Sequence, residues 1–180
     1  MKIDFHSHIL PGLDDGATSI DDSVMLVNAL KDWGFERITC TPHITNLHPN
    51  APDTILSSFN LLNEEIERSG LDIELRVSAE YRLVPQTWPS VLKNRWLMPI
   101  EDKYILMELP ISKPGQMGDI RPIEEFRKVL ALGLTPILPH PERYLYMTHR
   151  DLMSYVEAGV RLQCNYGSLA GLYGDQVKHN

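Results

Sequence analysis

The sequence predicts an α/β fold built on a parallel sheet, either an open doubly wound sheet or a β/α barrel. Short runs of apolar and β-branched residues alternate with amphipathic helical segments along all 180 residues. Hydrophobic residues make up 43% of the chain, which is enough for one sizeable core, and no linker divides it. We therefore expect a single domain over residues 1–180.

The first strand, expected over residues 2–9, carries His6 and His8. Side chains two residues apart on a strand point to the same face, so both imidazoles can bind one metal ion. A Pro-Gly turn then brings Asp14 and Asp15 beside them. Nitrogen and oxygen ligands together suit Zn, Mn or Fe, whereas two solvent-facing histidines are the alternative reading.

The next elements follow the same alternation. Ser19 and two aspartates begin a helix that ends at Gly34, and residues 36–43 are rich in β-branched side chains, as expected of a second strand. A second amphipathic helix stops at Gly70. Residues 72–81 form the expected third strand.

The middle of the chain contains one irregular segment, residues 85–99, in which we expect a short helix that packs inward. A fourth strand is expected over residues 103–110, followed by a loop over residues 112–118. The helix after it begins at Pro122 and reaches Gly133.

The last elements are a fifth strand over residues 134–141 and a helix that Thr148 and Asp151 begin with a capping box. A sixth strand is expected over residues 160–166. Ser168 opens a final helical stretch.

Five consecutive strands offer a histidine or glutamate at the same end. In a β/α barrel the carboxyl ends of all strands meet around one mouth, whereas an open sheet would spread these side chains out. No glycine-rich dinucleotide or phosphate loop supports the open sheet. The residues, in strand order, are His6 and His8, His43, Glu80, Glu108, and His140.

Each of these residues also has an ordinary structural interpretation. Glu80 and Glu108 interrupt apolar runs, and a buried carboxylate is paired, protonated or bound to metal. His43 and His140 could be hydrogen-bonded core histidines. Five strands with the same feature favour one shared metal site.

Arg143 follows His140 by three residues and is the candidate anion clamp, because a guanidinium matches phosphate oxygens in a fork geometry. The alternative is a surface salt bridge with Glu142. His48 and His149 lie in a loop and at a helix start, where we expect surface residues.

Composition excludes several classes of protein. A net charge of −7 without a run of Lys or Arg argues against nucleic acid or an anionic membrane as partner. The sequence has no apolar run of membrane-spanning length and no signal-peptide core, so we expect a cytoplasmic protein. Cys40 and Cys164 form neither a C-x-x-C pair nor a disulfide framework. A thiol phosphatase needs Arg six residues after Cys, and these positions hold Asn46 and Ala170.

Over essentially its whole length the chain resembles the PHP (polymerase and histidinol phosphatase) family of metal-dependent hydrolases. Within it, the sequence is most similar to the bacterial tyrosine-protein phosphatases of capsular and exopolysaccharide operons. The Pro-Gly-Leu-Asp-Asp-Gly-Ala extension and the His-Pro-Glu-Arg-Tyr string are the specific features. The matching segments are residues 6–17, Thr41-Pro42-His43, Ala79-Glu80-Tyr81, Met107-Glu108, and His140-Pro141-Glu142-Arg143-Tyr144.

This resemblance implies a distorted seven-stranded β/α barrel with up to three divalent metal ions, Mn first and Fe or Zn as alternatives. The implied activity is removal of phosphate from tyrosines in the tail of a tyrosine kinase that regulates polysaccharide export. Asp15 would be the acid that protonates the leaving group, with Asp14 as the fallback, and Arg143 would hold the phosphoryl oxygens. The implied ligands are His6, His8, His43, Glu80, Glu108 and His140.

The chain departs from the family at one point, because no Asp-x-His follows residues 4–6 although the family places one at the end of its last strand. We expect six strands with the seventh missing, in either a fragment or a naturally short form. An open barrel would invite association between chains. The alternatives to a tyrosine phosphatase are a PHP phosphomonoesterase of the histidinol-phosphate type and an inactive metal-binding module.

Overall fold

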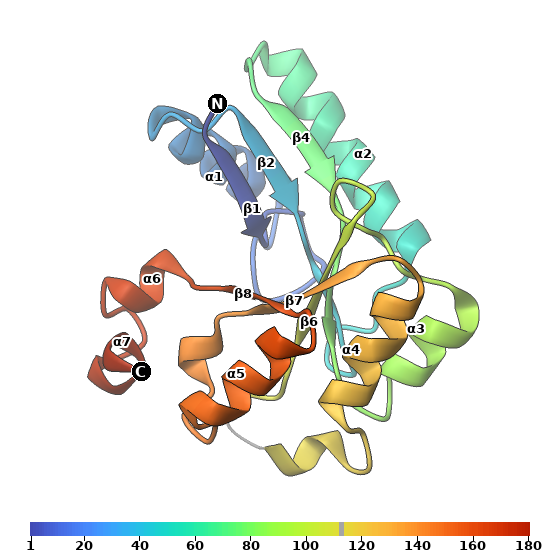
Figure 1. Cartoon of the computed structure of the whole chain (residues 1–180). Helices are drawn as coiled ribbons and strands as arrows, with labels where there is room; N and C mark the ends of the chain where they lie inside the picture. Colours follow the sequence, from blue (N-terminus) through green and yellow to red (C-terminus); the bar gives the residue numbers. More distant parts are fainter. Residues whose placement is uncertain (112–113) are drawn as a thin grey trace.

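Two parallel sheets form the centre of the protein, in a computed structural model that describes residues 1–111 and 114–180 (Figure 1). One sheet has the order β1-β2-β4 and the other β3-β5-β6-β7-β8, and all their strand pairs are parallel. The strands are β1 (Ile3–Ser7), β2 (Arg37–Cys40), β3 (His43–Ile44), β4 (Glu74–Val77), β5 (Glu80–Arg82), β6 (Tyr104–Glu108), β7 (Thr135–Pro139) and β8 (Arg161–Gln163).

Two of the expected strands are each broken into two, and the expectation of continuous strands there was wrong. Thr41 and Pro42 separate β2 from β3, and residues 78–79 separate β4 from β5. Pro42 has no N–H to offer a ladder, which explains the first break. The register continues across both breaks, because Cys40 pairs with Val77 and His43 with Glu80.

The helices begin and end largely where the sequence signals them. Capping boxes at Ser19 and Thr148 start α1 and α5, and Gly70 ends α2 in the left-handed conformation. In Figure 1, α1 and α2 flank the β1-β2-β4 sheet. The α-helices are α1 (Ile20–Asp32), α2 (Pro52–Ser69), α3 (Trp88–Asn94), α4 (Pro122–Ala131), α5 (His149–Glu157), α6 (Tyr166–Leu169) and α7 (Asp175–His179).

Two expectations about the second half of the chain were wrong. The segment expected to be a loop contains a 3₁₀ helix at Pro114–Met117, while residues 112–113 lie outside the described part. The last helical stretch begins before Ser168, because the Asn165 side chain accepts a hydrogen bond from the Gly167 N–H and caps α6. A second short helix, α7, follows α6.

The sheets curve, so that strands distant in order contact one another. Phe5 of β1 and Tyr104 of β6 pack edge to face with their ring centroids 5.9 Å apart. Phe5 and Tyr104 also pack against a small apolar cluster that includes Leu106 and Ile137. This curvature brings β1 close to the start of β6. None of the described helices is long and apolar enough to cross a membrane.

Candidate metal centre

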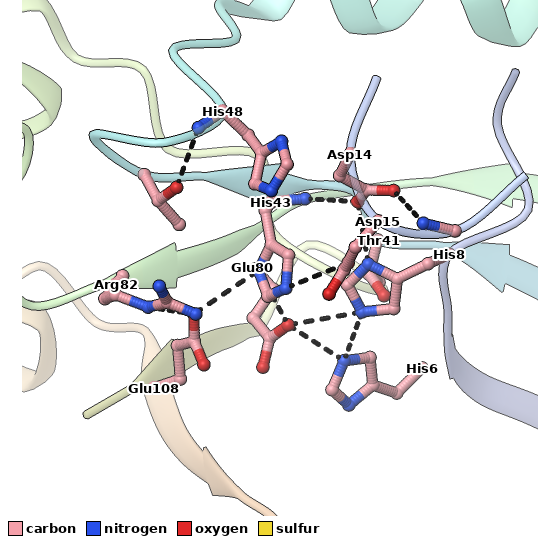
Figure 2. A network of polar contacts seen from close by, with 12 residues as sticks. His6, His8, Asp14, Asp15, Thr41, His43, His48, Glu80, Arg82 and Glu108 are labelled. Atoms are coloured by element: carbon pink, nitrogen blue, oxygen red, sulfur yellow. Dashed lines mark hydrogen bonds and ion pairs between the residues drawn. The ribbon is translucent and has the colours of Figure 1, made fainter. Parts of the chain in front are cut away.

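The structure brings together all six predicted histidines and glutamates at the carboxyl side of the strands. Side chains from β1, β3, β5 and β6 meet in Figure 2. His140 joins them from the residue after β7, where its φ of +40° lies in the left-handed region. Their places are His6 within β1, His8 after it, His43 opening β3, Glu80 opening β5, Glu108 ending β6, and His140.

Glu80 is the centre of the cluster and is fully buried. Burial disfavours its charge, but the surrounding imidazoles, His6 foremost, hold its carboxyl pKa well below the ordinary range. Figure 2 shows the carboxylate between the rings. Its Oε2 lies 3.2 Å from His6 Nε2, 3.3 Å from His8 Nε2 and 3.1 Å from His43 Nδ1, and its Oε1 lies 3.1 Å from His140 Nε2.

Glu108 places a second buried carboxylate in the same cluster. Its Oε1 lies 3.3 Å from His43 Nδ1 and accepts a hydrogen bond of 2.7 Å from Arg82 Nε. Burial, together with the negative charge of Glu80, raises the Glu108 pKa to about 8. Ligand oxygens of Glu80 and Glu108 lie within 4.8 Å of each other, so the two carboxylates repel when both are charged. A divalent cation between them would remove that repulsion.

Asp14 fixes the orientation of His8. Its Oδ2 accepts a hydrogen bond of 2.7 Å from His8 Nδ1 and another of 2.9 Å from the His43 backbone N–H. Its Oδ1 accepts from the Gly16 N–H at 3.0 Å. Because Nδ1 of His8 is occupied in this way, Nε2 is the ring nitrogen that faces the cluster, as in carboxylate–histidine–metal arrangements.

Asp15 lies at the mouth of the site instead. Its side chain is 72% exposed, and its Oδ1 is 3.6 Å from Nε2 of His43. The mouth opens from a cavity of about 320 Å³ that the cluster residues line together with Arg82 and Arg143. The two aspartates expected beside the histidines therefore occupy different positions, one inside and one at the entrance.

His48 differs from the sequence expectation. It is half-buried, and its ring stacks on that of His43 with centroids 5.9 Å apart and planes 14° apart. The expectation of a surface residue was therefore wrong for His48. His149 is exposed at the start of α5, as predicted.

Arg143 lines the cavity from the 3₁₀ turn at Pro141–Arg143. Its guanidinium carbon lies 4.4 Å from the ring centroid of Tyr173, a cation–π geometry. Glu142 turns inward, where its Oε1 accepts from the Asn165 N–H at 3.0 Å. The two neighbours therefore do not pair with each other as a surface salt bridge: Arg143 contacts Tyr173, and Glu142 contacts the Asn165 N–H.

The chemistry of the cluster fits divalent cations. Among the described residues, Nδ1 of His140 is buried without a hydrogen-bond partner, and Nδ1 of His43 and Oε2 of Glu80 approach each other at 3.1 Å without forming a hydrogen bond. Unpaired buried polar atoms are costly unless something else satisfies them. Three groups offer ligand atoms within 4.8 Å of one another: His6, His8 and Glu80; His8, Asp15 and His43; and His43, Glu80 and Glu108.

Sequence reasoning missed two residues that hydrogen-bond to the clustered side chains. Arg82, which holds Glu108, lies two positions after Glu80 and so on the same face of β5, a signal that could have been read. Gln163, at the end of β8, accepts a hydrogen bond of 3.0 Å from His6 Nδ1. Gln163 lies on a strand of only three residues, and no feature of the sequence there indicated a role in the site.

Known proteins are similar to this chain over nearly its whole length. The chain is 30% identical over 179 residues to the tyrosine-protein phosphatase YwqE of Bacillus subtilis, covering 98% of this chain and 69% of the relative. It is 28% identical to the putative tyrosine-protein phosphatase CapC of Staphylococcus aureus, with the same coverage of both chains.

A solved structure matches as well. It comes from the crystal structures of YwqE from Bacillus subtilis and CpsB from Streptococcus pneumoniae, described as unique metal-dependent tyrosine phosphatases. The TM-score is 0.83 at 30% identity, over 98% of this chain and 71% of the other. The family model of capsular polysaccharide synthesis, CpsB/CapC, matches residues 2–180. The chain therefore belongs to the CpsB/CapC family of capsular polysaccharide synthesis.

Proposed function

We propose that this protein is a metal-dependent protein-tyrosine phosphatase whose substrate is a phosphotyrosine segment of a tyrosine kinase that controls capsular polysaccharide synthesis. The observation that carries the proposal is the position of Glu80 Oε2, within 3.3 Å of nitrogens from three histidines. The names of the relatives YwqE, CapC and CpsB support the same activity.

The ligands in this proposal are the six clustered side chains, with up to three divalent ions, Mn first and Fe or Zn as alternatives. Mixed imidazole and carboxylate donors suit all three metals. Glu80 would offer both of its oxygens as ligand atoms, because each faces an imidazole nitrogen. The set consists of His6, His8, His43, Glu80, Glu108 and His140.

Bound metal would supply a water of lowered pKa and would polarise the phosphoryl oxygens. The protein's own residues do the rest. Arg143 binds the phosphoryl oxygens from the cavity wall and offsets charge that builds in the transition state. Arg82 and Asp14 hold Glu108 and His8 in place through their hydrogen bonds.

Asp15 is the candidate proton donor to the leaving tyrosine oxygen. It lies at the mouth, where a protein-borne tyrosine must enter, and its carboxyl is free of the contacts that occupy Asp14. Tyrosine has a pKa of about 10 and is a modest leaving group, so protonation assists the reaction.

We further propose that the curved sheets are six strand positions of a distorted PHP barrel. β1 pairs only with β2 and β8 only with β7 among the described strands, so each has one free edge. The side-chain hydrogen bond between His6 and Gln163 brings these edges near each other. A further parallel strand paired with both edges would close the barrel.

The test is phosphate release from a phosphotyrosyl peptide with added Mn. We expect His8→Ala to remove turnover, because it removes a ligand. His149→Ala should retain turnover, because His149 is exposed and belongs to none of the ligand groups. Turnover of histidinol phosphate in preference to the peptide would favour the small-molecule phosphatase instead. Peptide binding without phosphate release would show an inactive metal-binding module.

A further inference from the structure

A second hollow adjoins the metal site and is apolar. It encloses about 510 Å³ and shares Ile111, Arg143 and Tyr173 with the wall of the metal-site cavity. The rest of its wall consists of Leu145, Tyr146 and Val177. We refer to these six residues as the side groove. Because Arg143 stands at the junction, a phosphate held by its guanidinium has the side groove directly beside it.

Contacts with the rest of the protein hold the two tyrosines of the side groove and the helix beside them in place. The Tyr146 hydroxyl donates a hydrogen bond of 2.9 Å to the carbonyl of Pro110, just beyond the end of β6. Tyr173 lies against the Arg143 guanidinium, between α6 and α7. α7 is in turn tied to the 3₁₀ turn of Arg143, because the Asn180 amide donates to the carbonyl of Glu142 at 3.1 Å.

Apolar surface is left open in this groove. Leu145 is 50% exposed, Tyr173 41% and Tyr146 36%. An aromatic ring bound there would bury its own apolar surface and that of the groove wall. The rings of Tyr146 and Tyr173 could contact it edge to face or stacked. A short alkyl phosphate would reach Arg143 without filling the groove.

We propose that the side groove binds the aromatic ring of the phosphotyrosyl substrate and that Tyr173 sets the preference for aryl over alkyl phosphates. Tyr173 acts in two ways: its ring forms one wall, and its contact with the guanidinium positions Arg143 at the junction. This inference rests on the proposed function, since it assumes that the phosphoryl group sits between the metal cluster and Arg143.

The test compares kcat/KM for a phosphotyrosyl peptide and for the matching phosphoseryl peptide, both with Mn. In Tyr173→Ala we expect the ratio of the two values to fall about tenfold, mainly through a higher KM for the phosphotyrosyl peptide, since a lost ring contact and its buried area are together of that size. Tyr173→Phe should restore the ratio, because it keeps the ring. Tyr166→Ala, which changes an 88% exposed tyrosine outside the groove, should leave it unchanged.

A second variant covers the case in which Tyr173→Ala fails to fold. Leu145→Ala trims another wall residue at a half-exposed position and should lower the same ratio about threefold. An unchanged ratio in folded Tyr173→Ala, or in Leu145→Ala if the first variant does not fold, would overturn the proposal.

The failure of the proposed function can be told apart from the failure of this inference. If the wild type hydrolyses neither peptide, the affinities of both are measured by calorimetry on the Mn-loaded protein. Tighter binding of the phosphotyrosyl peptide that is lost in Tyr173→Ala would uphold the groove without the phosphatase activity. Equal affinity of the wild type for the two peptides would refute the groove as a ring site.

Discussion

Gly16 shows how closely the loop after β1 approaches the metal cluster. A Cβ atom at this position would lie 1.9 Å from the carbonyl oxygen of His8 and 2.6 Å from its Cβ. The Ala17 N–H donates to that same carbonyl at 3.0 Å, so the loop cannot move away without losing a hydrogen bond. Glycine is therefore required here for packing against His8.

We predict that Gly16→Ala lowers the affinity for Mn by about tenfold or more, because displacing a ligand or its support costs about that much. Calorimetric titration of the purified protein with Mn measures it. Gly115→Ala is the matched control, since a Cβ at that position would meet no heavy atom within 4 Å, and the affinity should not change. The same affinity in Gly16→Ala and wild type would contradict this role.

The candidate site could be predicted residue by residue where its side chains end strands. Glu108 was found because a charged group interrupts an apolar run, and His6 and His43 because their imidazoles lie toward the ends of expected strands. The different positions of Asp14 and Asp15 could not be found in this way. They depend on the path of the loop, which adjacent residues in a sequence do not reveal.

At the scale of elements, the capping box of α1 stabilises the fold through hydrogen bonds that one substitution can remove without changing the core. The Ser19 hydroxyl oxygen accepts a hydrogen bond of 3.1 Å from the Asp22 N–H. We predict that Ser19→Ala lowers the free energy of unfolding by about 1 kcal/mol, the usual effect of losing such a cap.

Urea denaturation followed by circular dichroism measures this change. Ser57→Ala in α2 is the control, because its hydroxyl only donates back to the Asp53 carbonyl of its own helix. We expect no loss of stability in that variant. A loss of equal size in both variants would show that the effect is not one of capping.

Helix ends were more predictable than strand ends for a physical reason. Caps are local, so Ser19, Thr148 and Gly70 determine their own helix ends. Strand ends depend on which partner each backbone group finds. The breaks between β2 and β3 and between β4 and β5 arise where the Thr41 and Ser78 N–H groups bond to Ser7 and Cys40 carbonyls.

At the scale of the whole molecule, metal binding should stabilise the fold. The cluster joins five strand positions. An ion bound only by the folded state adds free energy of unfolding in proportion to the logarithm of its concentration over Kd. At a Mn concentration of 100 times Kd this amounts to about 2.7 kcal/mol, or a rise in Tm of about 5–10 °C for a chain of this size.

Differential scanning calorimetry with Mn and with excess chelator tests this. His8→Ala should show a much smaller rise, and His149→Ala should show the full one. A Tm that does not respond to Mn in the wild type would argue against a site built across the strands.

The alternation of strands and helices was enough to predict the α/β class and the parallel pairing. It was not enough to predict the curvature, because the packing of Phe5 on Tyr104 joins residues 99 positions apart, as their numbers show. Nor did it predict the side groove, whose walls come from the end of the β6 segment, the turn after β7 and α7.

Each strand position pairs with the one that precedes it in the chain, from β1 to β8. A chain emerging from the ribosome could therefore add its strands one at a time in the order of synthesis. His6 and His8 would be present from the beginning, but Glu108 and His140 would join them only after β6 and β7 had docked. The ligand set is thus completed late in folding, so that a nascent chain would hold its metal ions weakly until most of the protein had been made.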